Sequence, residues 1–202
     1  MRYPKFFDSI ETIKVKDELS NALGAFEEGE YEFSYLDVVK AAGHSCPTVA
    51  GAYLMSLEAL KVLYPQQRAI RGDIKVEFAE ALEEGVAGVI ANAISQITGA
   101  TDKSGFKGLA GGMFARHSLM FFSADISSSA RFTRVSTGKS VDVIYNPSQI
   151  VPDPKMAEIM KKMGQNTATS HEAKEFSKLW QERVERIFLN KESVLHIDTL
   201  GM

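Results

Sequence analysis

The sequence predicts an α+β fold, with helices packed on a small mixed β-sheet and central elements in the order α-β-α-β-β-β. Residues 47–64 are apolar on every side at first and then follow helical spacing, and residues 86–97 repeat apolar side chains at the same spacing. Residues 73–78 alternate polar and apolar side chains, which is typical of a half-buried strand. Three more strands are expected at residues 113–123, 130–135 and 140–145.

Composition narrows the class of protein. The 202 residues are 45% hydrophobic and 24% charged, with a net charge of −3. These values are ordinary for a soluble globular protein, and the acidic balance predicts no nucleic-acid partner. No apolar run has the length of a membrane span or of a signal-peptide core, so we expect no membrane contact and a cytoplasmic location.

Segments on either side of the core are expected to have different roles. Residues 1–33 form a lead-in that packs on the core, so that residues 1–147 make one unit. A C-terminal helical arm is expected over residues 148–202, with three prolines near its start. In the arm, residues 156–163 form a methionine-rich amphipathic face, suited to an adaptable contact surface or to filling gaps in the core. Thr169 begins a longer amphipathic helix, and a terminal edge strand can follow it.

The motif Gly43-His44-Ser45-Cys46-Pro47 holds the only cysteine of the chain and one of its four histidines. Upstream, Ser34 and Asp37 predict a capping box that begins a short helix, and Gly43 suits the left-handed position that ends it. Pro47 suits the first position of the next helix, which makes Cys46 its N-cap. A thiol at the N-terminus of a helix lies in positive backbone potential, which favours the thiolate that acts as nucleophile or metal ligand.

Two interpretations of Cys46 remain open. A free cysteine often packs as a small buried hydrophobe, and one cysteine excludes an intramolecular disulfide. Alternatively, Cys46 and His44 both serve a site, either as a catalytic pair or as metal ligands. These two residues supply at most two of the three or four protein ligands that a zinc site needs.

Three further residues are candidates for the site. His117 is expected on the strand at residues 113–123, where a core histidine is the commoner role, and it is the best third partner for His44 and Cys46. Residues 99–112 hold five glycines but lack the Walker spacing, which indicates a mobile loop or lid rather than a phosphate loop. In this loop, Lys103 and Lys107 can meet an anionic substrate or cofactor, although solvated loop lysines are common.

The motif, followed by Gly51-Ala52-Tyr53 and Thr98-Gly99-Ala100-Thr101, resembles the FmdE family, proteins similar to one component of formylmethanofuran dehydrogenase. The resemblance covers about residues 36–146. It implies the α-β-α-β-β-β order, a homodimer with intertwined protomers, and an active or metal site that includes His44 and Cys46. This chain differs from many members in lacking the cysteines of a C-terminal zinc ribbon, and it has Ala100 where the family often has a second cysteine.

Three functional hypotheses follow. The first is a homodimeric FmdE-like protein with a transition metal on Cys46 and His44, completed by His117 or a carboxylate and acting on a small one-carbon or carboxylate substrate. Zinc suits a thiolate and an imidazole, with nickel and iron as alternatives. The second is a non-catalytic accessory or carrier protein that binds metal or haem and docks to a partner through the arm. The third is a metal-free enzyme with Cys46 as nucleophile and His44 as base.

Overall fold

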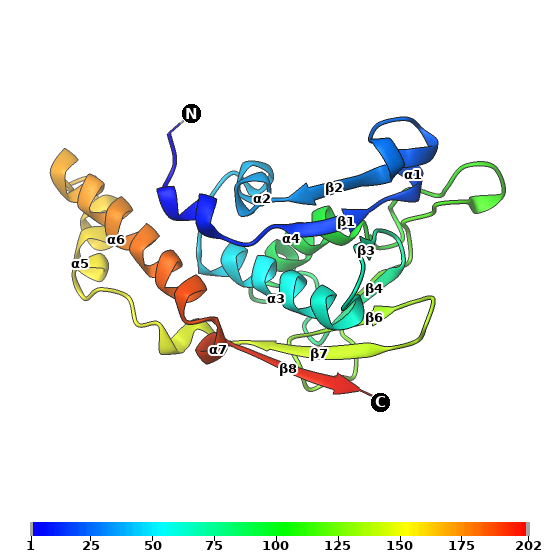
Figure 1. Cartoon of the computed structure of the whole chain (residues 1–202). Helices are drawn as coiled ribbons and strands as arrows, with labels where there is room; N and C mark the ends of the chain where they lie inside the picture. The colour runs from blue at the N-terminus through cyan, green and yellow to red at the C-terminus, as the bar shows by residue number, and fades with distance from the viewer. Residues whose placement is uncertain (1, 201–202) are drawn as a thin grey trace.

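A computed structural model describes residues 2–200. The chain begins with a short 3₁₀ turn and a β-hairpin, and the first two longer helices flank the cysteine motif (Figure 1). These elements are η1 (Lys5–Ser9), β1 (Ile13–Lys16), α1 (Glu18–Ala22), η2 (Glu27–Gly29), β2 (Glu30–Phe33), α2 (Tyr35–Ala42) and α3 (Pro47–Leu63).

The second part of the chain supplies the larger sheet and a helical hairpin. Its elements are β3 (Ala69–Ile70), β4 (Ile74–Phe78), α4 (Ala87–Thr98), η3 (Ala110–Gly112), β5 (Met120–Phe121), β6 (Ala130–Arg134), β7 (Ser140–Tyr145), η4 (Pro147–Gln149), α5 (Lys155–Gly164), α6 (Ser170–Leu189), α7 (Lys191–Val194) and β8 (Leu195–Leu200). From α3 to β7 the main elements run α-β-α-β-β-β, apart from the two-residue strand β3, so the predicted α+β class and order are confirmed.

The strands form two sheets. The smaller has the order β2-β1-β3, and the larger has the order β5-β4-β6-β7-β8. In the larger sheet only the β4–β5 pair is parallel, so the sheet is mixed as predicted. The pairing of β1 with β2, with Ile13 opposite Phe33, was not predicted, because strands of four residues have too short an alternation to indicate their partner.

Helix α3 lies between the two sheets and is the centre of the fold (Figure 1). Every residue from Val49 to Leu57 is buried, which explains why the helix is apolar on all sides rather than along one stripe. On one side the Tyr53 hydroxyl donates to the Glu11 and Phe33 carbonyls of the β1–β2 region. On the other side the ring of Tyr145, from β7, fills the space that Gly51 leaves by having no side chain.

A buried ion cluster joins the lead-in hairpin to the core. Asp17, the N-cap of α1, accepts hydrogen bonds from Arg71 at 2.7 Å and from Arg116 at 2.6 Å. Arg71 also donates to the carbonyls of Gln96 and Ile97, near the C-terminal end of α4. One carboxylate therefore holds together three segments that are far apart in the sequence.

The predicted strand over residues 113–123 is wrong over most of its length. Only Met120–Phe121 pairs with β4, and the residues before it are irregular. Phe114 and Ser118 have positive φ values of 61° and 57°, which interrupt the extended backbone that a strand needs. The apolar side chains of this stretch gave it the appearance of a strand.

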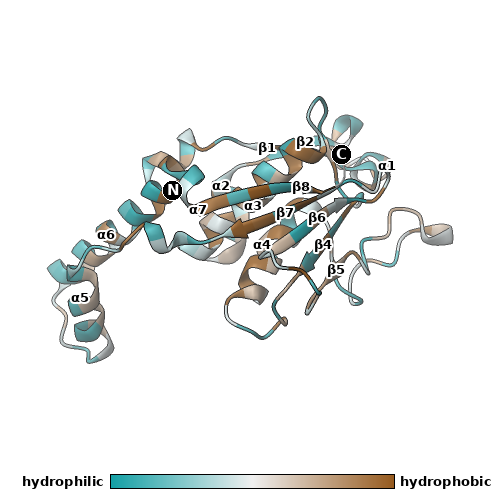
Figure 2. Ribbon diagram, turned by 90° about the horizontal axis from the view of Figure 1, so that it is seen from below, coloured by the Kyte–Doolittle hydropathy of each residue, from teal (hydrophilic) through white to brown (hydrophobic). Residues whose placement is uncertain are grey.

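The residues after β7 form two separate structures, a helical hairpin and an edge strand of the larger sheet. Helices α5 and α6 form a hairpin that projects from the rest of the molecule, and hydrophilic residues recur along both of its ribbons in Figure 2. The last strand, β8, then returns to the larger sheet and pairs with β7 along its whole length. None of the helices in residues 2–200 combines the length and apolar character needed to cross a membrane.

Candidate functional site

The backbone around the cysteine motif has the conformation that its sequence predicts. Ser34 and Asp37 form the capping box of α2, and Gly43 ends that helix with φ of 77°. Pro47 occupies the first turn of α3, and Cys46 is its N-cap with an extended backbone. Because each of these features depends on residues within a few positions of one another, local sequence was enough to predict them.

Cys46 is 9% exposed, and its Sγ accepts a hydrogen bond from the Val49 N–H at 3.4 Å. The sulfur thus caps a helix of seventeen residues and lies where the helix dipole is positive. Two phenols are close to it. Burial raises the pKa of Tyr35 and of Tyr145 well above the ordinary value, and the nearby Cys46 adds to both shifts. Both phenols therefore stay protonated at neutral pH and can act only as hydrogen-bonding groups there.

His44 lies on the segment between α2 and α3 and is exposed. Its Nδ1 is 3.0 Å from the Ala42 carbonyl oxygen. A carbonyl can only accept, so this contact favours the tautomer with the proton on Nδ1 and leaves the Nε2 lone pair free. Metal-ligating histidines are commonly held in this way through their second nitrogen.

Neighbouring elements fix the backbone of the motif. The Ser45 carbonyl accepts from Trp180 Nε1 at 2.9 Å and from Gln181 Nε2 at 3.2 Å, both on α6. The Tyr145 hydroxyl donates to the Pro47 carbonyl at 2.6 Å. Sequence reasoning missed these contacts. The one available signal was that Trp180 is the only tryptophan of the chain.

The other three candidates lie together, away from the motif. His117 follows the irregular loop after α4, and its Nδ1 is 3.1 Å from the Ser118 hydroxyl. Lys103 and Lys107 are exposed in the same loop, where the Lys107 ammonium donates to the Lys103 carbonyl. This loop projects at the end of the molecule where α3 finishes, whereas Cys46 is at the beginning of α3 (Figure 1).

Within residues 2–200, no three histidine, cysteine, aspartate or glutamate side chains are close enough together to hold a metal ion. His117 and the carboxylates therefore do not join Cys46 and His44 in one chain. The motif supplies two donors, an imidazole nitrogen and a sulfur, and both are of the types that bind zinc.

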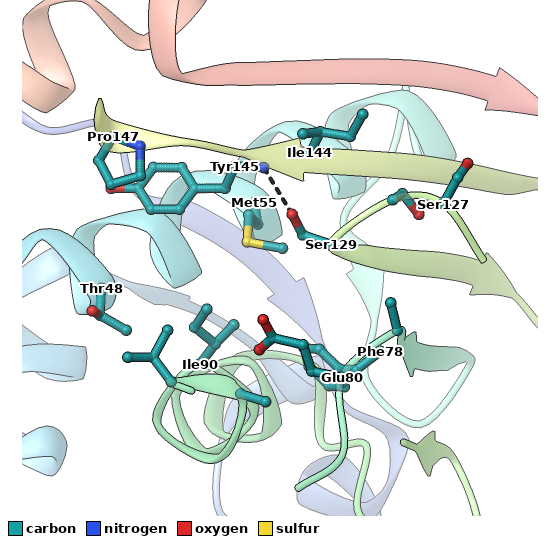
Figure 3. A pocket seen from close by; sticks show the side chains of 14 residues that line it. Thr48, Met55, Phe78, Glu80, Ile90, Ser127, Ser129, Ile144, Tyr145 and Pro147 are labelled. Atoms are coloured by element: carbon teal, nitrogen blue, oxygen red, sulfur yellow. Dashed lines mark hydrogen bonds between the residues drawn. The ribbon is translucent and has the colours of Figure 1, made fainter. Parts of the chain in front are cut away.

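A cavity of about 340 Å³ lies beside the motif. Thr48, in the first turn of α3, and Tyr145 line one side of it. The opposite side comes from the first turn of α4 and the loop that precedes it, and Figure 3 shows side chains from both sides facing one space. Cys46 is not in the wall, so the cavity and the cysteine are neighbours that share the start of α3.

Comparison with known proteins assigns the chain to a family. Residues 41–196 match the family described as "FmdE, Molybdenum formylmethanofuran dehydrogenase operon". No curated protein matches the chain. The match begins just before Gly43 and continues through α5 and α6 into β8, well beyond residue 146, where the resemblance of the motifs ends. The match covers more than half of the sequence, and the chain therefore belongs to the FmdE family.

Proposed function

We propose that this FmdE-family protein binds a transition metal, zinc by preference, through Cys46 and His44, and that the bound metal acts on a small one-carbon or carboxylate ligand. The observation that supports this most is the pair of donors on one rigid segment. The Cys46 sulfur is at a helix N-terminus, and the His44 imidazole is held through Nδ1 with Nε2 free. The family description links such proteins to the operon of a molybdenum formylmethanofuran dehydrogenase, which agrees with one-carbon chemistry.

The donor set fits a zinc ion as two of its ligands. A thiolate and an imidazole both suit zinc, and the Ala42 carbonyl is the kind of outer partner that orients a metal-bound histidine. A bound zinc ion would supply Lewis-acid chemistry. The protein holds the segment in place through the α6 donors to Ser45 and through Tyr145 on Pro47.

Two donors leave coordination positions for other groups. In the proposed homodimer a second copy of the chain fills part of the coordination shell, and water or the ligand takes the rest. A catalytic zinc site keeps such an open position, whereas a structural site is closed by protein ligands. Whether the bound metal keeps a position occupied by exchangeable water therefore distinguishes an enzyme from a storage or transfer role.

The first test is metal content. Untagged protein purified without chelator is offered zinc, and the metal is counted beside Cys46→Ser and His44→Ala. His171→Ala is the matched control, because His171 is also exposed but lies on α6 away from the motif. We expect about one metal per chain in the parent and the control and loss in both motif variants. X-ray absorption should find a sulfur neighbour at about 2.3 Å and a nitrogen neighbour at about 2.0–2.1 Å.

Trp180 provides a second readout that needs no metal analysis. It is the only tryptophan, and its indole N–H donates to the carbonyl of Ser45, the residue before Cys46. Metal binding at the motif should therefore change its fluorescence, and the change should be absent in Cys46→Ser. Well-folded parent protein that takes up no zinc, or that keeps its metal in both variants, contradicts the proposal.

A second candidate function is supported by the projecting hairpin. Met160 on α5 is 49% exposed and Met163 is 41% exposed, which leaves a polarizable apolar surface outside the core. Such a surface suits an accessory or carrier protein that binds metal or haem and docks to a partner. A metal ion with no exchangeable water, closed on all sides by protein ligands, would favour this function over catalysis.

A further inference from the structure

The cavity beside the motif has the size and walls of a small-molecule site. Its volume of about 340 Å³ lies in the range of such sites, about 300–1,000 Å³. Apolar side chains make most of the wall, among them Met55, Phe78, Ile90 and Ile144. Helix α3 and strand β7 form one side, and α4 with the loop before it forms the opposite side, so helices and a strand shape the space (Figure 3).

Among the polar groups of this wall that make no side-chain hydrogen bond within residues 2–200, one is a buried hydroxyl and one is a carboxylate. Ser128 is 4% exposed, it lines the cavity, and its hydroxyl makes no hydrogen bond. A buried hydroxyl without a partner is unfavourable by an amount comparable to a lost hydrogen bond. Glu80 also lines the cavity but is an exposed residue, and neither a hydrogen bond nor an ion pair to its carboxylate is found within residues 2–200, so the carboxylate is free to pair with a ligand. Figure 3 shows this carboxylate directed into the space between Met55, Ile90 and Ser129.

The charge of the wall decides what kind of head group fits. Glu80 is its only acidic residue, and no lysine, arginine or histidine lines the cavity. Helix α4 begins here at Ala87, its N-cap Val86 provides no side-chain cap, and its N-terminus carries roughly half a positive elementary charge. That partial charge offsets part of the full negative charge of Glu80, so the site remains negative. An anionic ligand is disfavoured, and a cationic donor is favoured.

We propose that the cavity binds a small organic ammonium ion, with its apolar body between the apolar side chains of α3 and α4 and its ammonium group paired with Glu80. The Ser128 hydroxyl then accepts a second ammonium hydrogen or bonds to a polar atom of the ligand. The neighbouring Ser129 Oγ already accepts from the Tyr145 N–H at 3.1 Å. This site is separate from the proposed metal site, since none of its wall residues is a metal ligand there.

The test uses three ligands of one shape: benzylamine, benzyl alcohol and benzoate. Protein with ¹³C-labelled methionine methyl groups is titrated with each, and the Met55 resonance reports occupancy because Met55 lines the cavity. We expect saturable shifts with benzylamine, weaker ones with benzyl alcohol, and none with benzoate. Absence of a saturable Met55 shift with benzylamine, or equal binding of benzoate, overturns the proposal.

Substitutions test whether the Glu80 carboxylate is the charge that binds benzylamine. Glu80→Gln should weaken benzylamine at least about tenfold, because a charge-assisted hydrogen bond is lost. Glu83→Gln is the matched control: it removes the same charge from an exposed residue of the same loop that does not line the cavity. Ser128→Ala should weaken binding a few-fold. Equal losses in Glu80→Gln and Glu83→Gln would show a general charge effect and overturn the proposal.

The proposals of a metal site and of an ammonium site can be refuted independently of each other. Cys46→Ser removes the proposed metal ligand but no wall residue of the cavity, so it should leave benzylamine binding unchanged. Glu80→Gln should likewise leave the metal content unchanged. Circular dichroism of each variant confirms that the fold is intact before binding is compared.

Discussion

Substituting Gly51 by alanine tests how the centre of the fold is packed. Gly51 is buried in the interior of α3, where alanine normally stabilises a helix by about 0.5–1 kcal/mol relative to glycine. Here, however, an added Cβ would lie 2.2 Å from Cε1 of the Tyr145 ring and 2.5 Å from its Cζ. Such distances are well inside van der Waals contact, so the ring or the helix must move.

The expected magnitude follows from three terms. Overpacking a core usually destabilises by about 1–3 kcal/mol. Moving the ring also endangers the hydrogen bond from the Tyr145 hydroxyl to Pro47, which contributes about 0.5–1.5 kcal/mol. These two effects outweigh the gain in helix propensity, so we expect Gly51→Ala to lower the free energy of unfolding by about 2 kcal/mol. In a chain of this size that corresponds to a fall in Tm of roughly 4–8 °C.

The assay is urea unfolding of the parent and the variant, followed by circular dichroism. Gly164→Ala is the control, because Gly164 ends α5 and has open space where its Cβ would be. It should be neutral or slightly stabilising. In the double variant Gly51→Ala/Tyr145→Ala the conflict is gone, so the two substitutions should be less destabilising together than the sum of their separate effects. A Gly51→Ala variant as stable as the parent would refute this account of the α3–β7 contact.

Three further predictions concern carboxylates and a helix cap. Asp17→Asn leaves two guanidinium groups without their buried carboxylate and should lower the free energy of unfolding by about 3 kcal/mol at neutral pH. Burial alone raises the pKa of Asp17, but Arg116, the Ser20 N–H and Arg71 together bring it below the ordinary 3.8. The carboxylate therefore contributes stability above pH 3.8 that is lost as the pH falls through the folded-state pKa, and the gap between parent and variant in urea unfolding should narrow on acidification. A gap independent of pH would contradict this. Thr169→Ala removes the N-cap of α6 and should destabilise that helix end by about 1 kcal/mol, measured as faster amide exchange in its first turn, with Ser170→Ala, next in sequence and not the N-cap, as control. In the same capping box, hydrogen bonds from Lys162 and from the Thr169 N–H and hydroxyl lower the pKa of Glu172 to about 2. A carboxylate whose pKa is lowered by folding loses its contribution as the pH falls through the folded value, so the pairing of α5 with α6 should weaken only near pH 2. A ¹³C titration of the Glu172 carboxyl carbon measures this pKa, and a midpoint at the ordinary 4.5 would speak against the pairing.

Long-range contacts account for what sequence reasoning missed at the site. Trp180 reaches Ser45 across 135 positions, and Arg116 reaches Asp17 across 99. Neither pair has a periodic pattern that could reveal it. His117 illustrates the same limit. It was expected on a strand, but the positive φ of Ser118 shows that this segment is a loop. The loop lies near the C-terminal end of α3, whereas Cys46 is at the N-terminal end, so His117 does not join Cys46 within one chain (Figure 1).

The sequence by itself determined the α+β class, the order of the central elements and the capped backbone around Cys46. These features depend on periodicity and on capping contacts that span three or four residues, so short segments of the sequence contain the information that predicts them. Only the tertiary structure decided that Tyr145 fills the space at Gly51, that α6 holds the motif, and that Glu80 and Ser128 face one cavity. Such juxtapositions arise when the whole core is packed, because close packing, rather than local propensity, selects which distant side chains meet.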